Sequence, residues 1–215
     1  MREIKTLLFD LDGTLIDSRA DLANAVNFAL ESSGQPKKPH DEIIPHIGNG
    51  LRVLLSEVFG PVSEEVLESG IASFSAHYDQ HCVDQTILYE NVLDILTDLS
   101  SSRQIGVVTN KPEKFSEKII HKLGLSNIIS VIVGGDSLPE KKPHPAPVLK
   151  ALRDLGAESE SSLFVGDGIQ DIQAGKTASL LTCIARYGFG FRSESIDLKP
   201  DFQIHRFNEL KEIVS

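Results

Sequence analysis

Short apolar segments rich in Leu, Val, Ile and Phe recur along this 215-residue chain, with helical patterns between them. These segments show little alternation of apolar and polar residues, which is typical of strands buried on both faces of a parallel sheet. The sequence therefore predicts an α/β fold, a doubly wound and mostly parallel sheet with a Rossmann-like core. The expected strands are residues 6–10, 105–109, 131–134, 163–167, 180–186 and 202–205, and the expected helices between them are residues 91–99, 112–123, 145–155 and 170–178.

One long stretch between the first two strands breaks this alternation. It contains about 70 residues without a convincing strand, too many for a simple crossover. Apolar residues recur there at helical spacing in three groups. We therefore expect an inserted α-helical domain at residues 17–86, a core formed by residues 1–16 and 87–215, and hinges near Asp17 and Glu90. The three groups are Leu22, Val26, Ala29 and Leu30, then Leu51, Leu54, Leu55 and Val58, then Val66, Leu67, Ile71 and Phe74.

Carboxylates follow two of the expected strands. Asp10 and Asp12 are two positions apart after the first strand, and Gly13 then permits a tight turn. Asp167 follows a later strand, with Asp171 four residues further on. Carboxyl ends of parallel strands lie at one edge of the sheet, where open α/β sheets bind ligands. Such a group of like charges is costly unless a cation compensates it, and oxygen ligands suit Mg²⁺. The sequence thus predicts a magnesium site at this edge.

Composition narrows the range of partners and compartments. The formal net charge is −10, which argues against nucleic acid or an anionic membrane as the main partner. Two cysteines indicate neither a disulfide framework nor a thiolate metal site. The N-terminal apolar run is interrupted by Asp10 and Asp12, so it does not match a signal peptide, and no segment is long enough for a membrane span. We expect a cytoplasmic protein.

Four ordered motifs resemble those of the haloacid dehalogenase superfamily of phosphotransferases. They are the segment Asp10-Leu11-Asp12-Gly13-Thr14, then Thr109, then Lys142, then Gly166-Asp167 through Asp171. The resemblance extends from about residue 4 to about residue 205. Finer features look like the phosphoglycolate phosphatase branch: FDLDGTLIDS, HIGNG, VVTNKP, GGDSLPEKKPHPAP and VGDGIQDI. In this superfamily a helical cap occupies the position of the insertion.

The resemblance implies a Mg²⁺-dependent phosphatase of small phosphorylated metabolites, with 2-phosphoglycolate as the first expected substrate. Asp10 matches the nucleophile that forms an aspartyl-phosphate, and Asp12 matches the general acid and base. Asp167 matches the metal-binding acid. Mg²⁺ would then lie among the Asp10 carboxylate, the Asp12 backbone carbonyl and the Asp167 carboxylate, and Asp171 would bind it directly or through water.

Other residues match phosphate-binding positions. The Thr109 hydroxyl and the Asn110 amide can donate hydrogen bonds to phosphate oxygens, although a Thr-Asn turn also caps helices. Lys142, followed by proline, matches the lysine that holds the phosphate and the carboxylates together, while we interpret Lys141 as solvated. Backbone amides of Leu11 and Gly13 are expected to complete the phosphate cradle.

Substrate choice is expected to come from the cap. The segment His46-Ile47-Gly48-Asn49-Gly50 is a glycine-flanked turn, which permits close backbone approach of a small ligand. Arg52 could pair with a substrate carboxylate, or it could be an ordinary solvated residue. His144 lies between two prolines, where contact with substrate and a role in shaping the loop are both open.

Two departures from the family pattern concern the hinge and the fourth motif. Phosphoglycolate phosphatases usually have Tyr-Pro-Gly where this chain has Tyr89-Glu90-Asn91, and Ser-x-Asn is more usual than Gly168-Ile169-Gln170. Neither change affects the expected nucleophile, lysine or principal metal acid.

Two alternative functions stay open at this point. A phosphosugar mutase would use the same four motifs with a different cap. A receiver-like signalling module also combines strand-end acids, Thr, Lys and Mg²⁺, but receivers are about half this length and lack the closely paired acids of the first motif. The sequence leaves both a monomer and a homodimer possible.

Overall fold

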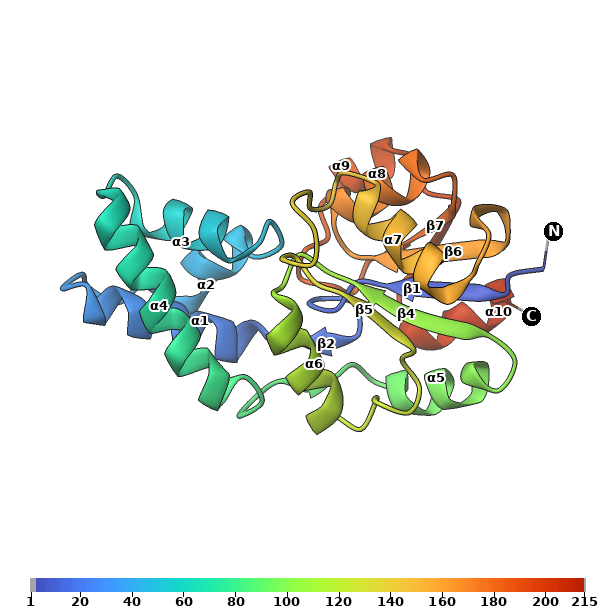
Figure 1. Ribbon diagram of the computed structural model, residues 1–215, viewed down its shortest axis with the longest axis horizontal. Helices are drawn as coiled ribbons and strands as arrows, with labels where there is room; N and C mark the ends of the chain where they lie inside the picture. The colour runs from blue at the N-terminus through green and yellow to red at the C-terminus, as the bar shows by residue number, and fades with distance from the viewer. Residues whose placement is uncertain (1–2, 215) are drawn as a thin grey trace.

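A six-stranded parallel sheet forms the centre of the protein in the computed structural model, which describes residues 3–214 (Figure 1). The strand order is β5-β4-β1-β6-β7-β8, so the N-terminal strand lies in the middle. In β1, Leu7 pairs with Ile105 on one side and Leu163 on the other. The strands are β1 (Thr6–Phe9), β4 (Gln104–Val108), β5 (Val131–Val133), β6 (Ser162–Gly166), β7 (Leu181–Ala185) and β8 (Phe202–Ile204).

Helices cover both faces of this sheet. Leu7 and Phe9 belong to the core on the face covered by α5 (Val92–Ser100), α6 (Glu113–Lys122) and α10 (Leu210–Val214). Leu8 belongs to the core on the other face, with α7 (Ala146–Leu155) and α8 (Ile169–Thr177). The doubly wound α/β architecture predicted from the apolar segments is confirmed. The remaining helical turns of this part are α9 (Glu194–Asp197), η2 (Ser159–Ser161) and η3 (Phe207–Glu209).

The insertion between the first two strands of the sheet is helical, as expected. Its helices lie together on one side of the sheet in Figure 1, and α1 packs along α4. A two-residue strand on each side, β2 (Ile16–Asp17) and β3 (Ile87–Leu88), pairs antiparallel and brings the two connections side by side. This short ribbon was not predicted from the sequence. The inserted elements are α1 (Arg19–Ser32), α2 (His40–Ile43), η1 (Ile44–His46), α3 (Leu51–Phe59) and α4 (Glu64–His81).

A buried carboxylate fastens the two connections to each other. Asp21, in the first turn of α1, accepts hydrogen bonds from the backbone N–H groups of Gln85 and Thr86 and from the Thr86 hydroxyl, at 2.8–3.1 Å. These contacts lie next to the β2–β3 ribbon. The predicted domain boundaries at residues 16/17 and 86/87 remain a prediction, and residues 1, 2 and 215 of the predicted core lie outside the described residues.

The atypical second hinge has a local explanation. Asn91, where the family that the sequence resembles usually has glycine, adopts a positive φ of 65° immediately before α5. Asparagine tolerates this left-handed conformation better than most residues other than glycine. The backbone at Asn91 therefore takes a conformation that glycine also adopts readily.

Within residues 3–214, no helix combines the length and the apolar character that a membrane crossing requires.

Candidate active site

The predicted site residues converge at the carboxyl ends of three adjacent strands. Asp10 follows β1, Thr109 follows β4 and Asp167 follows β6, and β1 pairs with both of the other strands. Residues up to 157 positions apart along the chain therefore meet at one edge because of the parallel register. Each of the three side chains is buried.

Lys142 connects two buried carboxylates, those of Asp10 and Asp171. Its Nζ atom lies 2.9 Å from Asp10 Oδ1 and 2.7 Å from Asp171 Oδ1, and it donates a hydrogen bond to the Val108 carbonyl oxygen at 2.7 Å. The Lys142 side chain is 1% exposed, while the neighbouring Lys141 is exposed, as expected. With three partners, Lys142 is placed to hold the two carboxylates in fixed positions.

Asp171 is held at both of its oxygens. Besides the contact with Lys142, its Oδ2 atom accepts a hydrogen bond from the backbone N–H of Gly168 at 2.9 Å, at the start of α8. The helix N-terminus favours this negative charge. Asp171 is therefore fixed in place by neighbouring protein groups, which favours the expected contact with a metal through water over a direct one.

Burial and mutual repulsion dominate the protonation of the acids. Burial raises the pKa of Asp10 to about 6, and Lys142 opposes this shift while Asp171 adds to it. Burial also raises the pKa of Asp167 well above its ordinary value, with further contributions from Asp10 and Asp171. The pKa of Lys142 is raised, because its pairing with Asp10 and Asp171 outweighs the larger single effect of burial, which lowers it.

The three acids fit a divalent cation. One carboxylate oxygen from each of Asp10, Asp167 and Asp171 lies within 4.8 Å of the other two. One buried lysine offsets at most one of the three negative charges that these carboxylates would carry together. An all-oxygen donor set with excess negative charge is the environment that Mg²⁺ prefers.

The loop that contains Gly188 and Gly190 covers Asp167, and the sequence did not predict this contact. The backbone N–H of Gly190 donates a hydrogen bond to Asp167 Oδ2 at 2.7 Å. Added Cβ atoms on Gly188 and Gly190 would come within 2.3 Å and 2.8 Å of Asp167 atoms. The two alternate glycines just after a predicted strand were the available signal, because they permit close approach of a backbone to another group.

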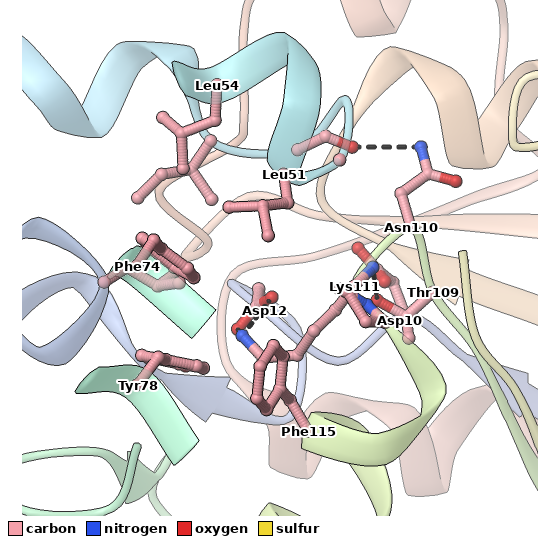
Figure 2. Close-up of a pocket in the computed structure, with 15 residues that line it drawn as sticks. Asp10, Asp12, Leu51, Leu54, Phe74, Tyr78, Thr109, Asn110, Lys111 and Phe115 are labelled. Carbon is pink, nitrogen blue, oxygen red and sulfur yellow. Dashed lines mark hydrogen bonds and ion pairs between the residues drawn. The ribbon is translucent and has the colours of Figure 1, made fainter. Parts of the chain in front are cut away.

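Asp12 has a different partner from the other acids. Both of its carboxylate oxygens accept hydrogen bonds from Lys111 Nζ at 2.9 Å (Figure 2). The Ser18 hydroxyl also donates a hydrogen bond to Asp12 Oδ1. Lys111 is nearly as buried as Lys142, with its side chain 4% exposed. Lys111 was not among the site residues predicted from the sequence. Its position two residues after Thr109 was the signal that could have identified it.

A pocket lies between this edge of the sheet and the inserted helices. Asp10, Asp12, Thr109 and Lys111 line one side (Figure 2). The opposite walls are mainly apolar, and the cavity volume is about 40 Å³. The side chains of these walls come from α1, α3, α4 and α6: Leu22, Leu51, Leu54, Phe74, Tyr78 and Phe115.

Thr109 and Asn110 occupy the expected position, but the Asn110 side chain has a structural role. Thr109 lines the pocket, and its hydroxyl oxygen accepts a hydrogen bond from the Lys111 N–H at 3.3 Å. Asn110 Nδ2 donates to the carbonyl oxygens of Gly48 and Lys142, both at 3.0 Å, and its Oδ1 accepts from the Lys142 N–H at 3.0 Å. The side chain therefore joins the inserted loop to the loop that carries Lys142.

The Gly13 amide, which was expected to bind phosphate, has a hydrogen-bond partner within the protein. Its N–H donates to the Ile16 carbonyl oxygen at 2.9 Å, because the chain turns back tightly into β2. Gly13 is instead required for space: its φ is +81°, and a Cβ atom would lie 1.9 Å from Asp167 Oδ2. Leu11 is fully buried behind the pocket, and its carbonyl oxygen accepts hydrogen bonds from Thr14, Leu15 and Ile16.

Only part of the predicted substrate loop faces the pocket. Gly48 and Gly50 line it, but Asn49 is exposed and is not part of the lining. Arg52 points away, because its guanidinium group pairs with Glu64 at 2.9 Å and with Glu68, both on α4. Leu51 and Leu54 face the pocket from the same helix, so helical geometry turns Arg52 to the outer side.

Two histidines near the predicted loops have structural partners. His46 Nδ1 lies 2.9 Å from Glu57 Oε2. His144 Nδ1 accepts a hydrogen bond from the Ala146 N–H at 3.2 Å at the start of α7, and its side chain is exposed. Of the two interpretations of His144, the structure favours a role in shaping the loop.

Comparison with known proteins agrees with this geometry. Residues 7–185 match the family described as haloacid dehalogenase-like hydrolase. The chain belongs to this family. A phosphoglycolate phosphatase of Aquifex aeolicus is 39% identical over 212 residues, covering 98% of this chain and 97% of that protein. One from Colwellia psychrerythraea is 34% identical over 218 residues, covering 98% and 96%.

A solved structure supports the same relationship. The crystal structure of a predicted phosphoglycolate phosphatase from Haemophilus somnus 129pt matches over all of both chains, with a TM-score of 0.91 and 32% identity. The resemblance inferred from the four motifs is confirmed. This haloacid dehalogenase-like chain is a phosphoglycolate phosphatase-like hydrolase.

Proposed function

We propose that this hydrolase is a Mg²⁺-dependent phosphatase that cleaves small phosphate monoesters, with 2-phosphoglycolate as its substrate. The observation that carries the proposal is the arrangement of Asp10, Asp12 and Thr109 on one side of a small pocket. Beneath them, Lys142 lies within ion-pair distance of Asp10 and Asp171. The names of the Aquifex and Colwellia relatives support the choice of substrate.

Each residue has a distinct role in the proposed reaction. An oxygen of Asp10 attacks phosphorus and displaces the alcohol, which forms an aspartyl-phosphate. Asp12 gives a proton to the departing oxygen and then takes one from the water that hydrolyses the intermediate. The Thr109 hydroxyl donates a hydrogen bond to a phosphate oxygen, and Lys142 fixes Asp10 for attack.

Asp10, Asp167 and the backbone carbonyl of Asp12 would hold Mg²⁺, with Asp171 contacting it through water. When bound, the cation offsets the repulsion between the acids and polarises the phosphoryl group. The described walls of the pocket opposite Asp10 and Asp12 are mainly apolar.

The proposed division of the chain follows from the same contacts. Residues 17–86 form the cap, and residues 1–16 and 87–215 form the catalytic core. The paired strands β2 and β3 bring both connections together, and Asp21 fastens residues 85 and 86 to α1. Through Gly48 and Tyr78 the cap supplies part of the pocket wall.

Phosphate release from a panel of monoesters tests this function. The panel contains 2-phosphoglycolate, hexose phosphates, nucleotides and pyrophosphate, each with Mg²⁺ and with EDTA. We expect Mg²⁺-dependent multiple turnover with preference for 2-phosphoglycolate. Preference for another monoester would refute the substrate, and absence of release from every compound would refute the phosphatase.

A further inference from the structure

The charge distribution of the pocket singles out one residue. Among the described residues that line it, Lys111 alone carries a positive charge, while Asp10 and Asp12 are acidic. Lys142 is not part of the lining, and its ammonium group already has three partners. Arg52, the cation expected from the sequence, faces away from the pocket.

Lys111 is held in a way that permits exchange of its partner. Its Nζ atom contacts both oxygens of Asp12 at 2.9 Å and lies 4.8 Å from the centre of the Tyr78 ring. An ammonium group offers three donors on a flexible four-carbon stem. The ring face and the buried stem keep the charge at the pocket whichever anion it contacts.

We propose that Lys111 binds a second anionic group of the substrate, a carboxylate, while the phosphate lies against Asp10 and Thr109. Lys111 then determines the selection of short phosphate monoesters that carry a carboxylate beside the ester carbon. This inference rests on the proposed phosphatase function and names the residue responsible for its substrate class.

The distances suit a short substrate. Asp12 must come within hydrogen-bond distance of the departing oxygen, about 2.7 Å, to give it a proton. Lys111 Nζ contacts the same carboxylate at 2.9 Å. The ammonium therefore lies within about 6 Å of the departing oxygen, a span that a carboxylate one carbon away from that oxygen covers. Leu51, Leu54 and Phe74 give the rest of the pocket an apolar surface that disfavours a more polar alcohol.

Binding of the carboxylate also makes Asp12 available. In the structure, both oxygens of Asp12 accept hydrogen bonds from Lys111. When the ammonium turns to the substrate carboxylate, one Asp12 oxygen is released toward the departing oxygen. An uncharged alcohol group offers Lys111 no competing anion and leaves it on Asp12.

Two substrates of matched length test the inference. 2-Phosphoglycolate and ethyl phosphate share a two-carbon alcohol but differ in the carboxylate. We expect Lys111→Met to lower kcat/KM for 2-phosphoglycolate by about 10- to 100-fold, the usual effect of losing a charge-assisted hydrogen bond. Ethyl phosphate has no carboxylate for Lys111 to bind, so the ratio of the two kcat/KM values, 2-phosphoglycolate over ethyl phosphate, should fall at least tenfold. Lys114→Met is the matched control, because Lys114 is exposed on α6, pairs with Asp79 at 3.1 Å and is not part of the pocket lining.

A binding measurement separates recognition from positioning. We expect Lys111→Met to raise the inhibition constant of phosphonoacetate at least tenfold and to leave that of inorganic phosphate unchanged. Equal losses for 2-phosphoglycolate and ethyl phosphate, with unchanged phosphonoacetate inhibition, would show that Lys111 only positions Asp12 and would overturn the inference. If Lys111→Met fails to fold, Lys111→Arg is used instead. It should retain the preference for 2-phosphoglycolate over ethyl phosphate, and loss of this preference would overturn the inference.

The wild-type enzyme distinguishes the two proposals. Turnover of ethyl phosphate without preference for 2-phosphoglycolate overturns the role of Lys111 and leaves the phosphatase intact. Absence of turnover with both compounds refutes the phosphatase itself.

Discussion

Asn110 donates a hydrogen bond to the Gly48 carbonyl oxygen across 62 positions of the chain, with 3.0 Å between the two atoms (Figure 2). Gly48 belongs to the inserted helical segment, and Asn110 follows strand β4. The same side-chain amide also bonds to both backbone polar groups of Lys142. One asparagine therefore aligns the cap loop with the loop that carries the buried lysine.

Asn110→Ala should impair both stability and activity. The carbonyl oxygens of Gly48 and Lys142 each lose a donor, which costs about 1–3 kcal/mol of unfolding free energy. We expect kcat/KM to fall about tenfold because Lys142 and the cap loop lose their common anchor. Urea unfolding and steady-state kinetics measure the two effects, with the exposed Asn208→Ala as control. Unchanged kinetics in Asn110→Ala would show that the cap loop is positioned by other contacts.

Asp10→Asn should abolish turnover and leave the fold intact. The amide is similar in size but does not attack phosphorus, and it removes one charge from a crowded acidic group. We expect the metal-free variant to melt at the wild-type temperature or above it. Asp94→Asn, at an exposed position on α5, is the control. Activity at a tenth of wild type or more would refute the assignment of Asp10 as nucleophile.

Gly13→Ala should destroy the site through contact, and a second glycine separates this effect from backbone strain. Gly13 and Gly124 have similar φ angles of +81° and +78°, but a Cβ atom on Gly124 meets nothing within 4 Å. Gly124→Ala should therefore lower stability by about 1–2 kcal/mol and keep full activity. Gly13→Ala should lower kcat/KM more than 100-fold, since its Cβ atom would displace Asp167. Thermal unfolding measures the stability of the two variants and steady-state kinetics their kcat/KM. Equal kcat/KM values for Gly13→Ala and Gly124→Ala would contradict this account.

The stabilising effect of Mg²⁺ should depend on pH. The pKa of Asp10 is raised to about 6 from 3.8, mainly by burial, so the metal-free folded state binds this proton more tightly than the unfolded chain. The resulting stability is fully present below about pH 4 and is lost as the pH rises through about 6. Mg²⁺ binds the ionised form, so it should raise the melting temperature more at pH 7.5 than at pH 5.

Melting curves in Mg²⁺ and in EDTA at the two pH values measure this difference. In EDTA, Asp10→Asn should show a smaller loss of stability between pH 4 and pH 6 than the wild type. An equal Mg²⁺-induced shift at pH 5 and pH 7.5 would mean that protons and metal do not compete at this site.

The strands and the acids that follow them could be predicted because their signals are local. Leu163, Phe164 and Val165 form an apolar run that suits a buried strand, and Asp167 comes directly after it. The parallel order of the strands then brings Asp10, Thr109 and Asp167 to one edge. The helical insertion was equally predictable, because apolar residues at helical spacing identify a helix wherever it packs.

The directions in which individual side chains and backbone amides point could not be predicted in this way. Arg52 and Leu51 are neighbours in the sequence, but only Leu51 faces the pocket, since α3 turns Arg52 toward Glu64. The Gly13 amide was expected to bind phosphate, yet the chain reversal into β2 gives it the Ile16 carbonyl oxygen as a partner. Both outcomes depend on how a short segment is rotated.

The sequence by itself determined the alternation of strands and helices, the position of the insertion and the acids at the strand ends. These features follow from the pattern of apolar residues and from the chemistry of individual side chains. The tertiary structure alone decided that Lys111 reaches Asp12, 99 positions away, and that Asn110 spans two loops. Such contacts arise from packing between segments that are distant in the sequence. A side chain bonds to the group that lies within reach and in the right direction, and only the folded chain defines both.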